Sequence, residues 1–223
     1  PVRIPAPAPE AHIDAVESGS WFLQTSPELC MKRLLAAGVP RLFQICKCFR
    51  YGERGRIHLP ELTMLEWYRA HSNYEDIMTE CENLIAAVVR HIGTDDILTY
   101  QGRQIELTPP WPRRSVSDAF KEFGSISMEK ALEQDRFDDI MVTEIEPRLG
   151  QAQPEFLYDY PAERGALARL KSQDPRLAER FELYIAGLEI CNAFSELADP
   201  IEQRERFERE QNHRRVSGKT VSP

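Results

Sequence analysis

The chain has 223 residues, which suits one sizeable domain or one domain with an insertion. Hydrophobic residues make up 42% and charged residues 29%, a balance that allows a packed core and excludes general disorder. The net charge of -8 argues against a protein that coats nucleic acid, because such a protein needs a basic surface. The five cysteines show no repeated spacing, so they indicate free thiols in a reducing cytoplasm rather than a disulfide framework or a zinc site. No apolar run reaches the roughly 18 residues of a membrane span, so no membrane partner is expected.

The N-terminal part predicts an extended segment, a helix and two strands. Residues 1–20 are rich in proline and are expected to be loop-like. Ser26, Pro27 and Glu28 can start a helix that Gly38 ends. Residues 42–50 and 62–68 alternate in polarity and predict an antiparallel pair joined by a long polar loop.

The remaining elements alternate between helices and strands. A helix is predicted for residues 74–91, a hairpin for 98–107, and weaker helices for 116–150. Strands are predicted for 156–160, 178–184 and 188–197, with a turn at Ala186 and Gly187. Asp199 and Pro200 are expected to begin a last charged helix that runs to about residue 215.

The first chemical cluster lies on the predicted strand–loop–strand. Arginine offers a planar fork that matches phosphate oxygens, and a loop with several cations, two glycines and a histidine can wrap a nucleotide. A carboxylate beside a tyrosine on the return strand can instead receive an ammonium group. The residues concerned are Arg50, Glu53, Arg54, Arg56, His58, Glu66 and Tyr68. The alternative interpretation is a charged hairpin loop in solvent.

The second cluster lies on the two predicted C-terminal strands. Glu182 and Glu189 are seven residues apart across the turn, so antiparallel pairing could bring their carboxylates together around a cation such as Mg²⁺. Asn192, Phe194 and Glu196 alternate and would share one strand face as an amine pocket. The alternative is an exposed sheet face with ordinary salt bridges.

These motifs together resemble the lysine-type class II tRNA synthetase family over nearly the whole chain. Residues 49–68 resemble its motif 2, residues 25–34 the segment upstream, and residues 187–197 its lysine-pocket strand, while Tyr160-Pro161-Ala162 matches another segment. Residues 65–69 and 178–184 look closest to a short group of ligases in that family. These ligases lack an anticodon-binding domain and attach (R)-β-lysine to a lysine of elongation factor P.

The resemblance implies an α+β class II catalytic fold over residues 1–223, an antiparallel sheet flanked by helices, with 93–155 as a variable insertion-like region. It also implies a cytoplasmic homodimer that uses ATP and Mg²⁺ to activate lysine or (R)-β-lysine. Arg50 would be catalytic and hold the α-phosphate. The ATP site would add Glu53, Arg56, His58, Glu189 and Ile190. Mg²⁺ would bind to Glu182 and Glu189. The amino-acid pocket would comprise Ser26, Glu28, Glu66, Tyr68, Asn192, Phe194 and Glu196.

The sequence departs from the family pattern at three positions. Gly52 stands where a glutamate is usual, Leu59 where an asparagine is usual, and Ala193 where a glycine is usual. Both ends look cut, and the resemblance implies that the motif 1 helix and motif 3 are missing, so the fragment alone is expected to be inactive. Three functions stay open: a ligase acting on elongation factor P, the core of a synthetase acylating tRNA-Lys, and a non-catalytic amino-acid-binding paralogue.

Overall fold

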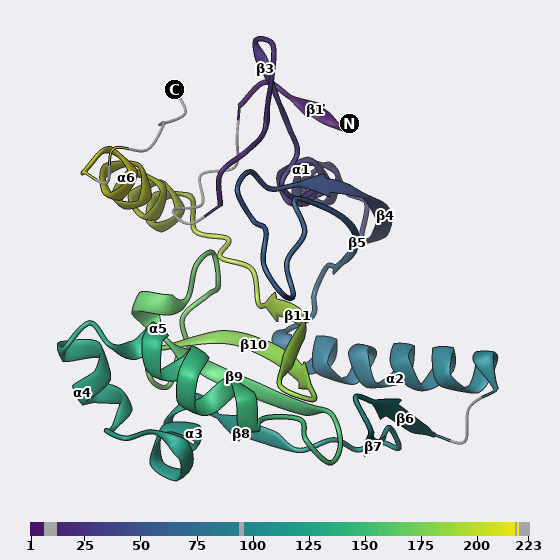
Figure 1. Cartoon of the computed structure of the whole chain (residues 1–223). Coiled ribbons are helices and arrows are strands. Elements are labelled where there is room, and N and C mark those ends of the chain that lie inside the picture. Colours follow the sequence, from purple (N-terminus) through teal and green to yellow (C-terminus); the bar gives the residue numbers. More distant parts are fainter. Residues whose placement is uncertain (7–12, 94–95, 217, 219–223) are drawn as a thin grey trace. The chain divides into compact units, whose positions relative to one another are not determined.

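The chain divides into two compact units in the computed structural model, which describes residues 1–6, 13–93, 96–216 and 218 (Figure 1). Unit 1 combines Pro1–His71 with Asp199–Pro223, and unit 2 is Ser72–Ala198. The mixture of helices and mainly antiparallel sheets confirms the predicted α+β class. Among the described helices, none combines the length and apolar character that crossing a bilayer requires.

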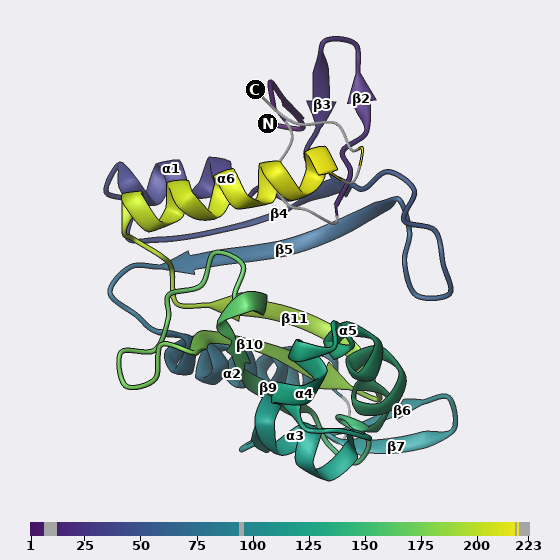
Figure 2. The same ribbon diagram turned by 90° about the vertical axis from the view of Figure 1, so that its left-hand side faces the viewer.

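Unit 1 is built around a long antiparallel hairpin, with a helix against its strands and a small separate sheet (Figure 2). The hairpin pairs β4 with β5 so that Phe43 lies opposite Trp67 and Gln44 opposite Glu66. The small sheet has the order β1-β3-β2. The elements are β1 (Arg3–Ile4), β2 (Glu17–Ser18), β3 (Trp21–Leu23), α1 (Glu28–Ala36), β4 (Arg41–Phe49), β5 (Glu61–Arg69) and α6 (Pro200–Val216).

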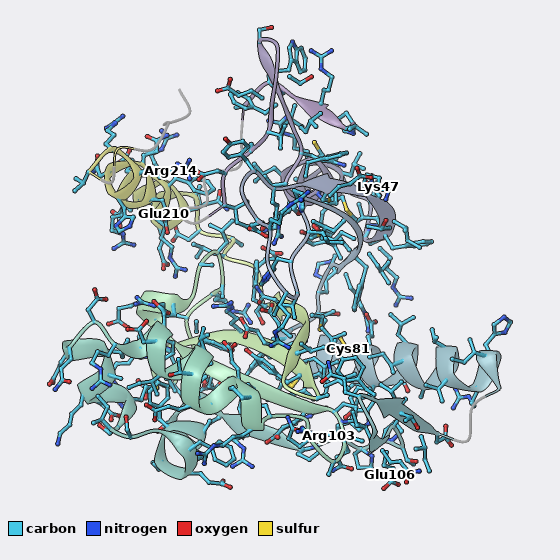
Figure 3. The ribbon with its side chains drawn as sticks, in the orientation of Figure 1. Lys47, Cys81, Arg103, Glu106, Glu210 and Arg214 are labelled. Atoms are coloured by element: carbon cyan, nitrogen blue, oxygen red, sulfur yellow. The ribbon has the colours of Figure 1, made fainter. Side chains whose placement is uncertain are left out.

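Both helices of unit 1 begin where the sequence predicts. Ser26 Oγ accepts a hydrogen bond of 3.0 Å from the Glu28 amide, although Pro27 occupies the N-cap position rather than the first turn. At α6, Asp199 Oδ1 accepts from the amides of Ile201 and Glu202. Near the other end of α6, Arg214 donates to Asp14 at 2.8 Å (Figure 3). A side-chain oxygen just before each helix therefore accepts hydrogen bonds from its first amides.

The covered face of the hairpin is its polar one. Phe43 and Ile45 are 74% and 64% exposed, whereas Cys48, on the opposite face, is buried. The reason is the segment leading into α1, which crosses the polar face: the Gln24 side chain donates to the carbonyl of Lys47 at 2.9 Å. The Gln24 side chain is therefore held against the polar face.

Unit 2 contains a four-stranded sheet in the order β11-β10-β9-β8, with helices on both faces (Figures 1 and 2). The β8–β9 pair is parallel and the other two pairs are antiparallel. The strands are β8 (Arg113–Ser115), β9 (Glu155–Pro161), β10 (Leu177–Ile185) and β11 (Leu188–Phe194), with a separate hairpin of β6 (Ile97–Tyr100) and β7 (Arg103–Glu106). The helices are α2 (Tyr74–Ile92), α3 (Val116–Phe123), α4 (Met128–Glu133), α5 (Phe137–Ile140), a π-helix (Met141–Ile145) and 3₁₀ turns (Glu146–Arg148 and Ala162–Arg164).

The two faces of this sheet have different neighbours. Tyr184 packs in a buried cluster with Phe120 and Phe137 of the α3–α5 region, whereas Ile185 packs with Val89 of α2. Cys81 lies on α2 (Figure 3), with its Sγ 3.8 Å from that of Cys191 on β11. All five cysteines are free thiols, as predicted. Residues 93–155 share these cores with β9 and β10, and their status as an insertion stays a prediction.

A buried polar network ties the start of α2 to the sheet. Tyr74 Oη donates to Asp159 at 2.9 Å, and Lys171 Nζ donates to Asp159 at 2.6 Å. The Tyr74 amide donates to Ser195 Oγ at 2.9 Å, so the residue following β11 accepts from the first amide of the helix, whose N-cap is Asn73. Asp159 has φ 59°, a left-handed conformation that aspartate tolerates better than most residues, where the β9–β10 register shifts.

Replacing Lys171 with methionine is expected to lower the free energy of unfolding by about 2 kcal/mol, because Asp159 then keeps a buried charge without its cation. Denaturant titration of the variant measures the loss. Lys121→Met removes an exposed ion pair with Asp118 and is the matched control, with an expected change under about 0.5 kcal/mol. Equal stabilities for the two variants would contradict a structural role for the network.

Candidate functional site

Unit 1 places a carboxylate between two hydroxyl donors. Ser26 Oγ donates to Glu66 Oε2 at 2.7 Å, and Tyr68 Oη donates to Glu66 Oε1 at 2.6 Å. Glu66 and Tyr68 share a face because they alternate along β5, and the turn before α1 brings Ser26 to them. Each oxygen of Glu66 can still accept one more hydrogen bond, so the carboxylate can receive a cationic donor.

Burial raises the pKa of Glu66 above its ordinary value of 4.5, and the hydrogen bonds from Tyr68 and Ser26 counter only part of that effect. The Glu28 amide donates to Ser26 Oγ at 3.0 Å, which places this predicted pocket residue close by, and the charge of Glu28 raises the pKa of Glu66 further. Glu28 is itself paired with Lys32 at 2.5 Å, an i,i+4 contact on α1. Four of the predicted pocket residues, Ser26, Glu28, Glu66 and Tyr68, therefore come together within unit 1.

Arg50 directly follows β4, and alternation along the strand puts it on the face of Gln44, which pairs with Glu66. Its Nε is buried and has no hydrogen-bond partner among the described residues. Its Nη1 lies 3.8 Å from Glu53, and its amide donates to the carbonyl of Pro60 at 2.9 Å. A buried donor without an acceptor is costly unless a ligand supplies one, so Arg50 fits an oxyanion such as a phosphate.

The loop between β4 and β5 carries three of the predicted ATP residues. Arg56 and His58 are exposed in this loop, whose own amides and carbonyls form turns, as between Gly55 and His58. Of the predicted ATP residues in this loop, the structure brings only Glu53 to Arg50 within the described part of the chain. The roles of Arg56 and His58 stay predictions.

Unit 2 buries Glu182 among three donors that were not predicted as site residues. Arg180 donates to Glu182 Oε1 at 2.6 Å, while Tyr160 and Tyr184 each donate to Oε2 at 2.6 Å. Burial and the neighbouring charge of Glu182 raise the pKa of Tyr160 and Tyr184, so both phenols stay protonated as donors. Burial alone would lower the pKa of Arg180, but the electrostatic effects of Glu182, Tyr160, Glu189 and Tyr184 raise it above its ordinary value.

A β-bulge brings Glu189 to the same face of the sheet. Leu183 pairs with Cys191, but Tyr184 pairs with Glu189, so Ile190 is the extra residue on β11. Glu182 pairs with Asn192 and Arg180 with Phe194, and the bulge therefore turns Glu189 toward the face that carries Asn192 and Phe194. Ile190 is 50% exposed, and Glu196 follows β11 in a bridge with Ala168.

Glu182 does not fit the predicted Mg²⁺ site as its side chain stands. Its Oε2 already accepts two hydrogen bonds, and its Oε1 faces a guanidinium whose positive charge would repel the metal. Among the described residues, no group of three His, Cys, Asp or Glu side chains is arranged to hold a metal. The cation that neutralises Glu182 in this structure is Arg180.

Two of the three donors around Glu182 could have been found from the sequence. Arg180, Glu182 and Tyr184 alternate on one strand and must share a face, which places a guanidinium and a phenol beside the carboxylate. Tyr160 could not, because its approach depends on the β9–β10 register.

A cavity of about 130 Å³ lies beside the cluster and is lined in part by Glu146, whose pKa is raised by burial and by the charge of Glu182.

Comparison with known proteins gives two consistent results. The family model described as tRNA synthetases class II (D, K and N) matches residues 4–220. A protein of Vibrio atlanticus (strain LGP32) is 41% identical over 208 residues, and one of Pectobacterium atrosepticum is 38% identical over 217 residues; both are named elongation factor P–(R)-β-lysine ligase. These alignments cover 91% and 94% of this chain but 64% and 66% of the relatives, so the chain spans less than two thirds of their length. Because the family match runs through almost the entire sequence, the chain belongs to the class II tRNA synthetases of the D, K and N group.

Proposed function

We propose that the protein containing this chain activates a lysine-type amino acid with ATP and transfers it to a lysine of elongation factor P. The observation that carries the proposal is one face of the β4–β5 hairpin. It holds the buried Nε of Arg50, which has no acceptor among the residues that the structure describes, and the carboxylate of Glu66 between two hydroxyl donors. A cationic group for an oxyanion and an anionic group for an ammonium are what the binding of ATP and a diamino acid requires.

The chemistry proceeds in two transfers. An oxygen of the amino-acid carboxylate attacks the α-phosphorus of ATP, the bond to the β-phosphate oxygen breaks, and pyrophosphate leaves. The target amine then attacks the activated carbonyl carbon, loses a proton, and AMP leaves. The protein contributes positioning and charge neutralisation, with Arg50 on the α-phosphate and Glu66 on the side-chain ammonium.

Several parts of this proposal extend beyond unit 1. The predicted amino-acid pocket also takes Asn192, Phe194 and Glu196 from unit 2, and the ATP site takes Glu189 and Ile190. ATP is used with Mg²⁺ in this proposal, but no step is assigned to a metal held by Glu182. The two relatives, whose names specify elongation factor P and (R)-β-lysine, support the choice of acceptor and substrate. A homodimer is part of the proposal as well.

An acceptor-labelling experiment tests the proposal. The complete protein is supplied with ATP, radiolabelled lysine or (R)-β-lysine, tRNA and elongation factor P, and the labelled product is identified. We expect label on elongation factor P. Label on tRNA instead would contradict elongation factor P as the acceptor and favour a tRNA synthetase. If neither amino acid supports ATP–pyrophosphate exchange, the proposed activation step is contradicted. Elongation factor P with its acceptor lysine replaced by arginine is the control.

A further inference from the structure

Arg180 has four contacts that hold its guanidinium in one orientation. Besides Glu182, its Nη1 donates to the carbonyl of Arg164 at 2.6 Å and its Nε donates to Asn192 Oδ1 at 3.1 Å. The guanidinium carbon lies 4.4 Å from the centroid of the Tyr160 ring. The side chain of Arg180 is 16% exposed, so these contacts form in a largely dry environment, where they are strong.

The bond to Asn192 determines which way its amide faces. A guanidinium has only donors, so only the amide oxygen of Asn192 can face Arg180. The two N–H groups of the amide are then the part left for a ligand, and Asn192 is exposed on the face that also carries Glu189 and Phe194. In this orientation Asn192 donates to an acceptor atom and does not receive an ammonium.

We infer that Arg180 is a positioning residue, which fixes the Asn192 amide so that it donates to an anionic oxygen of a substrate. The inference rests on the proposed function, in which that oxygen belongs either to the amino-acid carboxylate or to a phosphate of ATP. Glu182 takes part by supplying the charge that keeps the guanidinium in place, which explains why it is enclosed by donors.

Arg180→Lys tests the inference, because lysine keeps a positive charge beside Glu182 but its single ammonium cannot also reach Asn192 with the planar fork of arginine. In ATP–pyrophosphate exchange with the complete protein, we expect the KM for one substrate to rise about tenfold while the KM for the other stays unchanged. A change in the amino-acid KM identifies the carboxylate, and a change in the ATP KM identifies a phosphate. Arg169→Lys, which alters an exposed pair with Glu179 at 2.6 Å, is the matched control and should change neither.

A double-mutant cycle with Asn192→Ala separates positioning from a purely structural effect. If Arg180 acts through Asn192, Arg180→Lys should cost less than about threefold once the amide is absent. An undiminished loss in the Asn192→Ala background, or unchanged KM values in the single variant, would overturn the inference while exchange by the wild type upholds the proposed function. No exchange by the wild type would overturn both.

Asn192→Asp gives a second reading that does not depend on how well the Arg180 variant folds. Aspartate keeps an oxygen for Arg180 but loses both donors, so the affected KM should rise at least as much as in Asn192→Ala. An Asn192→Asp protein with wild-type KM values would overturn the donor role of Asn192 and with it the role of Arg180.

Discussion

Replacing Arg50 with alanine is expected to lower the rate of ATP–pyrophosphate exchange by about 100- to 1,000-fold, with almost no change in thermal stability. The loss follows from the proposed role of the guanidinium in neutralising charge at the α-phosphate. Stability is expected to hold because the buried Nε makes no hydrogen bond among the described residues, and the contact with Glu53 is long, at 3.8 Å. The backbone bond from Arg50 to Pro60 survives the substitution.

Arg41→Ala is the matched control, because Arg41 begins the same strand and is exposed. Exchange kinetics and thermal unfolding should be measured on both variants. A large fall in the unfolding temperature of Arg50→Ala would mean that the residue is structural. Equal exchange rates for the two variants would remove Arg50 from the proposed chemistry.

Features governed by neighbouring residues were predictable from the sequence. The alternation of residues 42–50 and 62–68 predicted β4 and β5, and the turn at Ala186 and Gly187 predicted the β10–β11 pair. The contact of Ser26 with Glu66 was predictable only in part. Alternation puts Glu66 and Tyr68 on one face of the strand, whereas Ser26 was predicted from the family resemblance. Apart from the contribution of Ser26, the determining pattern in each case lies within a single element or turn.

Features that depend on pairing between elements were not predictable in this way. Alternation predicted an apolar and a polar face for β4, but the sequence does not show which face the rest of the chain covers. The segment containing Gln24 covers the polar face. The bulge at Ile190 is likewise a property of register, and it is what turns Glu189 toward the face of Asn192. The spacing of these residues therefore did not predict their orientation.

The metal site shows the same limit in its chemistry. Seven-residue spacing suggested that Glu182 and Glu189 would meet around Mg²⁺, and the strand pairing does put them on one face. Spacing between two carboxylates cannot show which donors compete for them. Arg180 and Tyr184 lie on β10 with Glu182, and Tyr160 lies on β9. Their hydrogen bonds occupy both oxygens of Glu182 without a metal.

Glu66→Gln is expected to have opposite effects on binding and on stability. The KM for a lysine-type amino acid should rise about 100-fold, because the substrate ammonium loses its charged acceptor. The free energy of unfolding at neutral pH should stay the same or rise, because burial penalises the ionised carboxylate of Glu66 in the free protein. Glu61→Gln, on the same strand in an exposed pair with Lys47, is the control and should leave the KM unchanged.

The pH dependence of the wild type follows from the same raised pKa. A carboxyl group whose pKa is higher in the folded state favours folding most at acid pH, and its contribution is lost as pH rises through the folded-state pKa. Substrate binding runs the other way, since an ammonium needs ionised Glu66, so affinity should fall as pH drops through that pKa, at a value above 4.5. Calorimetric titration with the amino acid from about pH 5 to pH 8 measures this and should show proton release in the acid part of the range. A Glu66→Gln protein that binds normally would mean that the ammonium is held elsewhere.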